Sequence, residues 1–304
     1  MTFGAGSYWI KKISNTRKPR IVMALLVRNE EDIIEMNIRF HANKGVNAFI
    51  VMDNGSIDRT CEIIQVLAGE YDLKIIKCND DSFRQSRWMT NLAVLAYDKF
   101  GADLVIPNDA DEFWIPNNGE SLAACLNHRD VAVYCNRYNM IPEMDNSFKN
   151  TQHCVVNPIP YTKEFQLLNP NVSLLLNKLR QKVLVNPRGL LKITQGNHRA
   201  IHIYSPLFSR TSADICIYHY PIRSLNQFQT NARIYKKILA NSPAAKIGSQ
   251  WRRWAAIESD EQLEQEFRMM TLKKEEIEML YRLGILESRP LPARELSAIT
   301  LTLT

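Results

Sequence analysis

Residues 105–114, Val-Ile-Pro-Asn-Asp-Ala-Asp-Glu-Phe-Trp, are a short apolar run that ends at an acidic cluster and is followed at once by large apolar residues. If the run is a β-strand, Asp109 and Asp111 point the same way, because side chains alternate along a strand. Two such carboxylates can share one ion, and hard oxygen ligands suit Mg²⁺ or Mn²⁺ that carries a substrate phosphate. The stretch therefore predicts a metal site at a strand end; the alternative interpretation is a solvated acidic turn.

Four short runs of aliphatic and β-branched residues predict strands that are mostly buried on both faces. These runs are residues 21–27, 48–52, 73–77 and 103–107. Apolar residues at helical spacing between them predict three helices, with Ser56 and Ser86 as N-caps of the second and third. Alternating strands and helices imply parallel pairing with right-handed crossovers. We therefore expect an α/β fold, a doubly wound and mainly parallel sheet with helices on both faces.

Polar clusters follow the first, second and fourth predicted strands. They are Arg28-Asn29-Glu30, Asp53-Asn54-Gly55-Ser56 and Asp109 to Glu112. In an open α/β sheet, ligands bind beyond the carboxyl ends of the strands, where the strand order reverses. Because all three clusters lie at such ends, the sequence predicts that they belong to one binding site.

In order and spacing, these motifs resemble those of bacterial family-2-like glycosyltransferases with the GT-A fold. The resemblance is strongest over residues 20–115; it is carried by Val27 to Glu35, Asp53 to Asp58 and Asp109 to Phe113, and more weakly by Lys182 to Pro187 and His219 to Phe228. It implies an enzyme that transfers a sugar with inversion from a nucleotide-diphosphate donor, with a divalent metal on the diphosphate. The implied acceptor is a glycan or a lipid-linked glycan, in the synthesis of bacterial surface polysaccharide.

The resemblance and the residue chemistry together predict a set of ligand-binding residues. Asp109, Asp111 and His219 are the predicted metal ligands, and Arg223 would neutralise the leaving diphosphate. The donor itself is expected to bind at Arg28, Asn29, Glu30, Asp53, Arg84, Arg87, Asp109 and Arg223. Two alternatives stay open: Asn29 and the acidic residues after it suit a helix start, and Arg84 and Arg87 suit a solvated surface.

Inversion needs a general base near the acceptor hydroxyl. Glu143, Asp145, His198 and Asp214 all follow the metal motif, where the acceptor half of the fold is expected. A lone histidine is more often a structural hydrogen-bonding residue, so the sequence leaves the choice among these four open.

The sequence pattern changes along the chain from strand-like to helix-like, and this change suggests how the chain divides into parts. Residues 131–135, 153–156 and 183–185 predict further strands, whereas residues 225–239 and 261–283 have helical spacing. The expected parts are a basic N-terminal arm (1–19), a GT-A-like catalytic domain (20–223) with a nucleotide-binding half (20–115) and an acceptor half (116–223), and a helical C-terminal region (224–304). The last residues, Leu301 to Thr304, are expected to fray or to pack at an edge.

Composition agrees with an enzyme of this kind. The 304 residues, 45% hydrophobic and 23% charged, can bury a large core, and disorder is not indicated. Six cysteines without a Cys-x-x-Cys pair suggest thiols in a reducing compartment. No run is long enough to span a membrane, and no signal-peptide core is recognisable, so we expect a cytoplasmic protein.

The net charge of +6 is concentrated in part in the N-terminal arm. This arm would either touch anionic lipid at the inner face of the membrane, near a lipid-linked acceptor, or act as a solubilising tail. Nucleic acid is not an expected partner, because no recognition motif accompanies the charge. Two other functions fit the acidic cluster: a nucleotidyl- or phosphotransferase, which the lack of a Gly-rich phosphate loop disfavours, and a non-catalytic sugar-nucleotide-binding scaffold.

Overall fold

The computed structural model describes residues 17–78, 80, 84–144, 146–162, 165, 174–204, 208–241, 243 and 249–303. Most of the predicted N-terminal arm and the candidate base Asp145 lie outside these residues.

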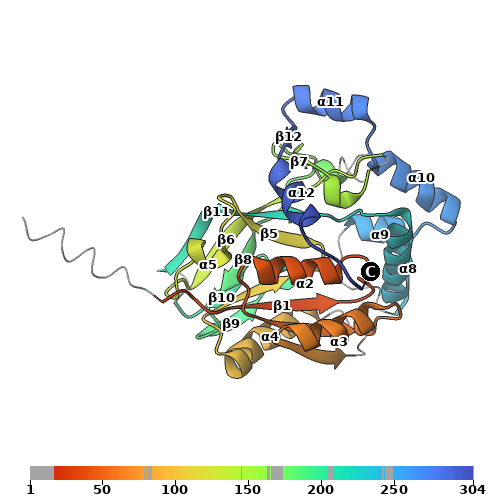
Figure 1. Cartoon of the computed structure of the whole chain (residues 1–304). Coiled ribbons are helices and arrows are strands. Elements are labelled where there is room, and N and C mark those ends of the chain that lie inside the picture. Colours follow the sequence, from red (N-terminus) through yellow and green to blue (C-terminus); the bar gives the residue numbers. More distant parts are fainter. Residues whose placement is uncertain are drawn as a thin grey trace, which may run out of the picture.

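The main sheet, within this part of the chain, has eight strands in the order β3-β2-β1-β4-β8-β6-β11-β5 (Figure 1). Their bounds are β1 Ile21–Val27, β2 Ala48–Asn54, β3 Leu73–Cys78, β4 Leu104–Asn108, β5 Glu112–Pro116, β6 Ala132–Asn139, β8 Lys182–Val185 and β11 Ser209–His219. The first four strands are parallel, and β8 runs antiparallel to both β4 and β6. β11 is parallel to β6, and β5 pairs with it in the opposite direction at the edge.

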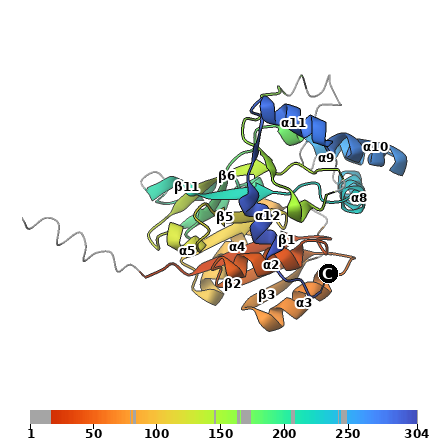
Figure 2. The same ribbon diagram turned by 45° about the horizontal axis from the view of Figure 1, so that its top comes forward.

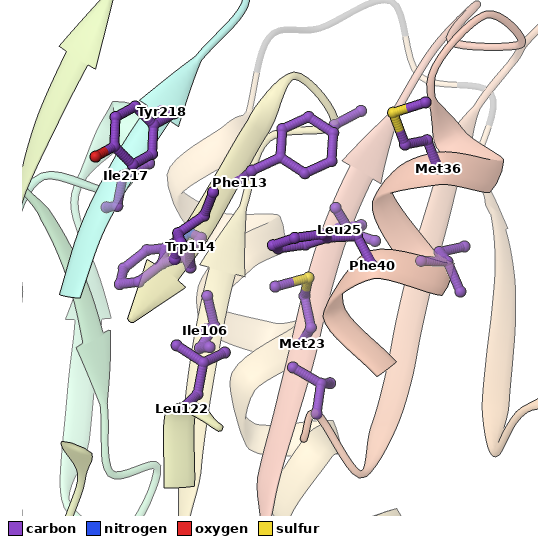
Figure 3. Packing of buried hydrophobic residues seen from close by; sticks show 14 of the residues in the cluster. Met23, Leu25, Met36, Phe40, Ile106, Phe113, Trp114, Leu122, Ile217 and Tyr218 are labelled. Atoms are coloured by element: carbon purple, nitrogen blue, oxygen red, sulfur yellow. The ribbon is translucent and has the colours of Figure 1, made fainter. Parts of the chain in front are cut away.

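Helices cover both faces of the parallel half. Met23 and Leu25 of β1 pack in one cluster with α2 (Ile34–Asn43) and α3 (Thr60–Glu70), whereas Ala24 packs with α4 (Gln85–Phe100) on the other face (Figures 1 and 2). This division follows from the alternation of side chains along a strand. Figure 3 shows the first cluster, in which residues of β1 and α2 lie close to those of β4 and β5. The prediction of a doubly wound, mainly parallel α/β sheet is confirmed.

The two predicted helix N-caps are wrong. The hydroxyl of Ser56 donates to Asp53 of β2 and accepts the backbone N–H of Asn29 at 2.9 Å, and α3 starts four residues after Ser56, at Thr60. Ser86 is already inside α4, where its hydroxyl donates to the carbonyl of Ile193 at 2.5 Å. Both serines satisfy a tertiary hydrogen bond instead of a helix end, which a local pattern does not reveal.

Smaller elements complete the part of the fold formed by residues 116–223. An antiparallel ribbon of β9 (Leu190–Ile193) and β10 (Ala200–His202) lies against α4. The remaining short elements are α5 (Leu122–Cys125), β7 (His153–Val155) and the 3₁₀ turns η1 (Phe148–Asn150), η2 (Leu174–Leu176) and η3 (Gln195–Asn197).

The C-terminal region is mainly helical, as expected, but it is not an independent unit. Its helices are α8 (Leu225–Asn241), α9 (Ser249–Ala255), α10 (Asp260–Met270), α11 (Lys274–Arg282) and α12 (Pro290–Ser297). The single helical run predicted over 261–283 is broken at Leu272, whose backbone N–H donates to the carbonyl of Pro142 at 3.0 Å. A short strand, β12 (Leu286–Ser288), then pairs with β7. None of the helices in the described ranges is long and apolar enough to cross a bilayer.

Residues 302 and 303, near the end of the chain, are tied to α2 by hydrogen bonds. Glu35 is fully buried on α2, and its carboxylate accepts hydrogen bonds from the backbone N–H groups of Thr302 at 2.8 Å and Leu303 at 3.0 Å. Arg39, one turn along the same helix, donates to it at 2.9 Å. Burial by itself raises the pKa of Glu35, but these donors outweigh it and hold the pKa below the ordinary 4.5.

Replacing this carboxylate by an amide tests the anchor. A depressed pKa stabilises the fold above the unfolded-state pKa, and this stability is lost as the pH falls through the folded-state pKa. Glu35→Gln should therefore lower the free energy of unfolding by about 1–3 kcal/mol at pH 7, and the difference from wild type should shrink below pH 4.5. Urea unfolding at several pH values measures it. The exposed Glu275→Gln is the matched control, and an equal effect of both variants at pH 7 would refute the anchor.

Candidate functional site

The acidic turn, Asp109-Ala110-Asp111, joins β4 to β5 beside the end of β1. Its backbone is held by buried amides: Asn37 Nδ2 donates to the carbonyls of Ala110 at 2.7 Å and Glu112 at 3.1 Å, and Asn108 Nδ2 donates to Glu112 at 3.1 Å. Chain order also reverses here, because β4 returns to the side of β1 opposite to β2. The turn therefore lies at a topological switch point, where α/β sheets bind ligands.

A buried histidine braces the same region. Nε2 of His41 accepts the backbone N–H of Trp114 at 3.1 Å, so the proton of the neutral ring sits on Nδ1, which donates to the carbonyl of Asn37 at 2.8 Å. Burial lowers the pKa of His41 to about 3. The ring is thus neutral at physiological pH and serves as a rigid link between α2 and β5.

Each carboxylate of the acidic cluster has its own cationic partner. Lys182, a lysine of β8 whose side chain is 1% exposed, lies 2.5 Å from Asp109 and 3.1 Å from Glu112. Arg137 of β6 reaches the fully buried Glu112 at 2.6 Å. Burial would raise the pKa of Glu112, but Lys182 and Arg137 outweigh it and lower the pKa. Glu112 therefore braces the turn as an anion.

Asp111 faces His219 at the end of β11, with 3.3 Å between its Oδ2 and Nε2 of the ring. Nδ1 of His219 lies 2.7 Å from Oδ1 of Asn139, whose own Nδ2 donates to the carbonyl of Leu175. Since an amide oxygen can only accept, Nδ1 carries a proton and Nε2 is directed at Asp111. Burial alone would raise the pKa of Asp111, but His219 and Arg223 hold it well below its usual range.

This geometry permits two states. In one, His219 is an imidazolium ion paired with Asp111; in the other, the neutral ring opposes its Nε2 lone pair to a carboxylate, which is favourable only with a cation between them. Asp111 and His219 thus fit a divalent ion that takes its other ligands from water and substrate phosphate. Among the described residues, no group of three or more His, Cys, Asp or Glu side chains could hold a metal by itself.

Arg223 connects the acidic turn to the first strand. Its side chain is 1% exposed and pairs with Glu30 at 2.8 Å and with Asp32 at 2.7 Å, while Asp111 lies 3.9 Å away. Burial raises the pKa of Glu30 to about 8, even though Arg223 opposes the shift. Arg223 therefore supplies fixed positive charge beside Asp111.

The other residues predicted near the nucleotide do not all face the same space. Arg28 lines the cavity described below. Asn29 has a left-handed backbone (φ 55°), and its side-chain oxygen accepts the N–H of Ile57 at 2.8 Å. Asp53 is 4% exposed and accepts hydrogen bonds from Ser56 and, at 3.1 Å, from Cys61. Asn29 and Asp53 thus brace the loops that present Arg28 and Asn54.

A cavity of about 380 Å³ opens over the turn. One half of its wall is polar and comes from the strand ends; the other half is largely apolar and comes from α8, α9 and neighbouring segments. The polar half includes Arg28, Glu30, Asn54, Asp109, Asp111, Asn139 and His219. The cavity therefore brings residues from the three predicted clusters together with the end of β11.

Arg84 and Arg87 line a different space. Both border an open groove of about 470 Å³ between α4 and β9, together with Asn91 and Lys192. Gln85 lines both the groove and the cavity over the acidic turn. The two arginines are thus neighbours of the candidate site and not part of its wall.

The described candidates for the general base differ in their surroundings. Asp214 is exposed and lines neither the cavity over the acidic turn nor the one that Glu143 borders. Glu143 pairs with His153 at 2.9 Å and borders a separate cavity of about 410 Å³, which Arg223 also lines. His198 lies next to Gly196, a residue of the cavity wall, and its Nδ1 is 2.9 Å from the carbonyl of Gln181. Burial, together with the nearby charge of Lys182, lowers the pKa of His198 to about 4.

Several residues that shape the site are absent from the set predicted from the sequence. They are Asn37, Arg137, Asn139, Lys182 and the aromatic residues of α8 and α9. The sequence could have indicated Lys182, because a lysine that begins a strand otherwise made of Val and Leu needs a buried partner. No local pattern indicates the two asparagines, because each forms hydrogen bonds with residues far away in the chain.

Comparisons with known proteins give remote likenesses. No protein-family model matches the chain, and no curated protein does either. Among solved structures, it is similar to Staphylococcus aureus TarS 1–349 (10% identity, 82% of this chain and 70% of that one, TM-score 0.41) and to the same protein in complex with UDP-GlcNAc (11%, 78% and 70%, 0.43). It is also similar to glucosyl-3-phosphoglycerate synthase of Mycobacterium tuberculosis in complex with Mn²⁺, UDP and glucosyl-3-phosphoglycerate (15%, 82% and 86%, 0.36).

The role of Lys182 can be tested through stability. Lys182→Met keeps the length of the side chain but leaves Asp109 and the buried Glu112 without their shared cation, and it should cost about 3–5 kcal/mol of unfolding free energy. Chemical denaturation at pH 7 measures this. Lys192→Met, on the exposed face of β9, is the control and should stay within about 0.5 kcal/mol of wild type. Equal stability of the two variants would contradict a structural role for Lys182.

Proposed function

We propose that this protein is a metal-dependent glycosyltransferase that moves a sugar from a nucleotide-diphosphate donor to a glycan or lipid-linked acceptor, with inversion. The observation that carries the proposal is the pair of Asp111 and His219 at the switch point. Asn139 directs Nε2 of His219 at Asp111, and the pair opens into a cavity lined by Arg28 and Glu30. An acidic and imidazole half-site of this kind leaves several positions of Mg²⁺ or Mn²⁺ for phosphate oxygens.

Asp111 and His219 would hold the ion. Asp109 lies beside them and pairs with Lys182. A divalent ion there would stabilise the charge that develops on the leaving diphosphate. Arg223, fixed by Glu30 and Asp32, adds positive potential at the same place without a change of conformation. Arg28, Glu30 and Asn54 line the end of the cavity next to β1 and β2, which suits the nucleotide.

For the general base we assign His198. With its Nδ1 proton directed at the carbonyl of Gln181, the neutral ring has a free lone pair on Nε2, and its lowered pKa keeps it neutral at pH 7. In the transfer, the acceptor oxygen bonds to the anomeric carbon, the bond from that carbon to the diphosphate oxygen breaks, and the hydroxyl proton passes to the base. Glu143 is less suited, because it borders a different cavity.

The proposed setting of the reaction is the cytoplasmic side of a bacterial membrane. Synthesis of bacterial surface polysaccharide in the cytoplasm, at the inner face of the membrane, would supply both a nucleotide sugar and a lipid-linked acceptor. The basic N-terminal arm would provide the contact with anionic lipid.

A ligand that binds only the folded state raises the melting temperature, so nucleotide binding can be measured by thermal shift. UDP or a UDP-sugar with Mn²⁺ should stabilise the wild type by about 2.7 kcal/mol at a hundred times its Kd, and less without the metal. Asp111→Asn should abolish the metal-dependent part, whereas Asp98→Asn, an exposed site on α4, should keep it. If no nucleotide diphosphate stabilises the folded wild type with Mn²⁺ or Mg²⁺, the proposed function is wrong.

Asn139 offers a second test, because its oxygen fixes the tautomer of His219. Asn139→Leu should weaken Mn²⁺ binding in the presence of UDP by about 10- to 100-fold, measured from the EPR signal of free Mn²⁺. Asn139→Asp keeps an acceptor for Nδ1 and should retain tight binding. Asn136→Leu, on the exposed side of the same strand, should leave the affinity unchanged. Equal affinities of the Leu and Asp variants at position 139 would show that His219 is not a ligand.

A further inference from the structure

The apolar half of the cavity wall is aromatic. Tyr235 of α8 and Trp251 and Trp254 of α9, which we call the aromatic wall, all line the cavity over the acidic turn. Helices α8 and α9 lie at the end of the sheet to which the parallel strands point (Figure 1). The aromatic wall thus covers the carboxyl ends of the strands.

The rings are fixed against one another and against the core. Tyr235 stacks on Trp251 with 4.4 Å between ring centroids, and Trp251 meets Trp254 edge-on at 4.9 Å. Trp254 in turn packs edge-on against the fully buried Phe228 at 5.0 Å. Such contacts restrict the rings, so the wall is formed before any ligand binds and little conformational entropy is lost on binding.

Polar groups accompany the rings. Trp254 is 4% exposed, and its indole N–H is buried with no hydrogen-bond partner among the described residues. Asn231, one turn before Tyr235 on α8, also lines the cavity. The hydroxyl of Tyr235 lies in the field of Glu30, Asp109 and Asp111, and burial together with these carboxylates raises its pKa. The wall therefore offers aromatic surface, unused hydrogen-bonding capacity and closeness to the acidic turn at once.

We propose that the aromatic wall is the acceptor subsite and takes a pyranose ring, so that the acceptor is recognised as a carbohydrate by Tyr235, Trp251 and Trp254. This inference rests on the proposed function. The donor nucleotide and diphosphate match the polar half of the cavity, which leaves the aromatic half for the acceptor. A pyranose has a face of C–H bonds that suits aromatic rings and a rim of hydroxyls that suits the indole N–H and Asn231.

Other occupants match this wall less well. A hydrocarbon chain would cover the rings but would also take the side-chain amide of Asn231 out of water without offering it a hydrogen-bond partner, which is costly. A nucleobase would stack on the rings, but it would put the nucleotide in the half of the cavity that lacks Arg28 and Asn54. A saccharide satisfies both the apolar and the polar parts of the wall.

Saturation-transfer NMR with the full chain, UDP and Mg²⁺ tests the subsite. The probes are methyl β-glucopyranoside, methyl α-mannopyranoside, N-acetylglucosamine and octyl β-glucoside. With wild type, we expect transfer to the ring C–H protons of at least one sugar. Trp251→Ala should weaken that sugar's binding at least tenfold and leave the UDP signals unchanged. Tyr281→Ala, an exposed aromatic residue on α11, is the matched control and should change neither.

Two further variants guard against loss of folding. Trp254→Phe keeps a ring but removes the N–H, and Tyr235→Phe removes only the hydroxyl; both should remain folded by circular dichroism and weaken the sugar signal. Equal loss of UDP and sugar binding in Trp251→Ala would assign the wall to the donor and overturn the inference. So would transfer confined to the octyl chain, or sugar signals that Trp251→Ala does not change. If wild type binds no UDP, the proposed function fails first.

Discussion

The site depends on the compensation of buried negative charge. Asp109, Asp111 and Glu112 lie within four consecutive positions, and taking such a cluster out of water is costly unless each charge is paired. The pairing cations come from late in the chain: Arg137 from β6, Lys182 from β8, and His219 and Arg223 from β11 and the segment after it. The acidic turn and the strands of the second half therefore require one another. The parallel half of the sheet supplies the carboxylates, and the remaining strands supply the positive charge that compensates them.

The same ion pairs determine which side chains of the turn face the cavity. Lys182 and Arg137 hold Glu112 as a structural anion, which leaves Asp111 with His219 on the side of the cavity. Arg223 is fully enclosed, and the cavity that borders it next to Glu143 is separate from the cavity over the turn. Arg223 lines the cavity next to Glu143, and its three carboxylate neighbours, Glu30, Asp32 and Asp111, fix its position. The arrangement gives each acidic residue a distinct chemical environment within a few ångströms.

Much of the parallel half could be predicted from the sequence. The strands β1 to β4 agree with the predicted apolar runs to within two residues, and the three polar clusters do lie at their ends. These features are local, because strand length and alternation are set by consecutive residues. The partners of the clusters could not be found in this way, since Asn37, Asn139 and Lys182 act across 36 to 80 residues of chain. The helix starts were predicted wrongly for a related reason: Ser56 and Ser86 have tertiary hydrogen-bond partners, Asn29 and Ile193, and do not cap a helix.

The tie between Glu35 and the last residues has a consequence for how the chain reaches its final state. The donors that satisfy this buried carboxylate are 267 and 268 residues further along, so the first βα unit emerges from the ribosome long before its partners exist. Until residues 302 and 303 have been synthesised, the only described partner of the Glu35 carboxylate is Arg39 of the same helix. A helix near the start of the described chain therefore gains its last hydrogen bonds only when synthesis is almost finished, and until then α2 opens more readily than in the completed fold.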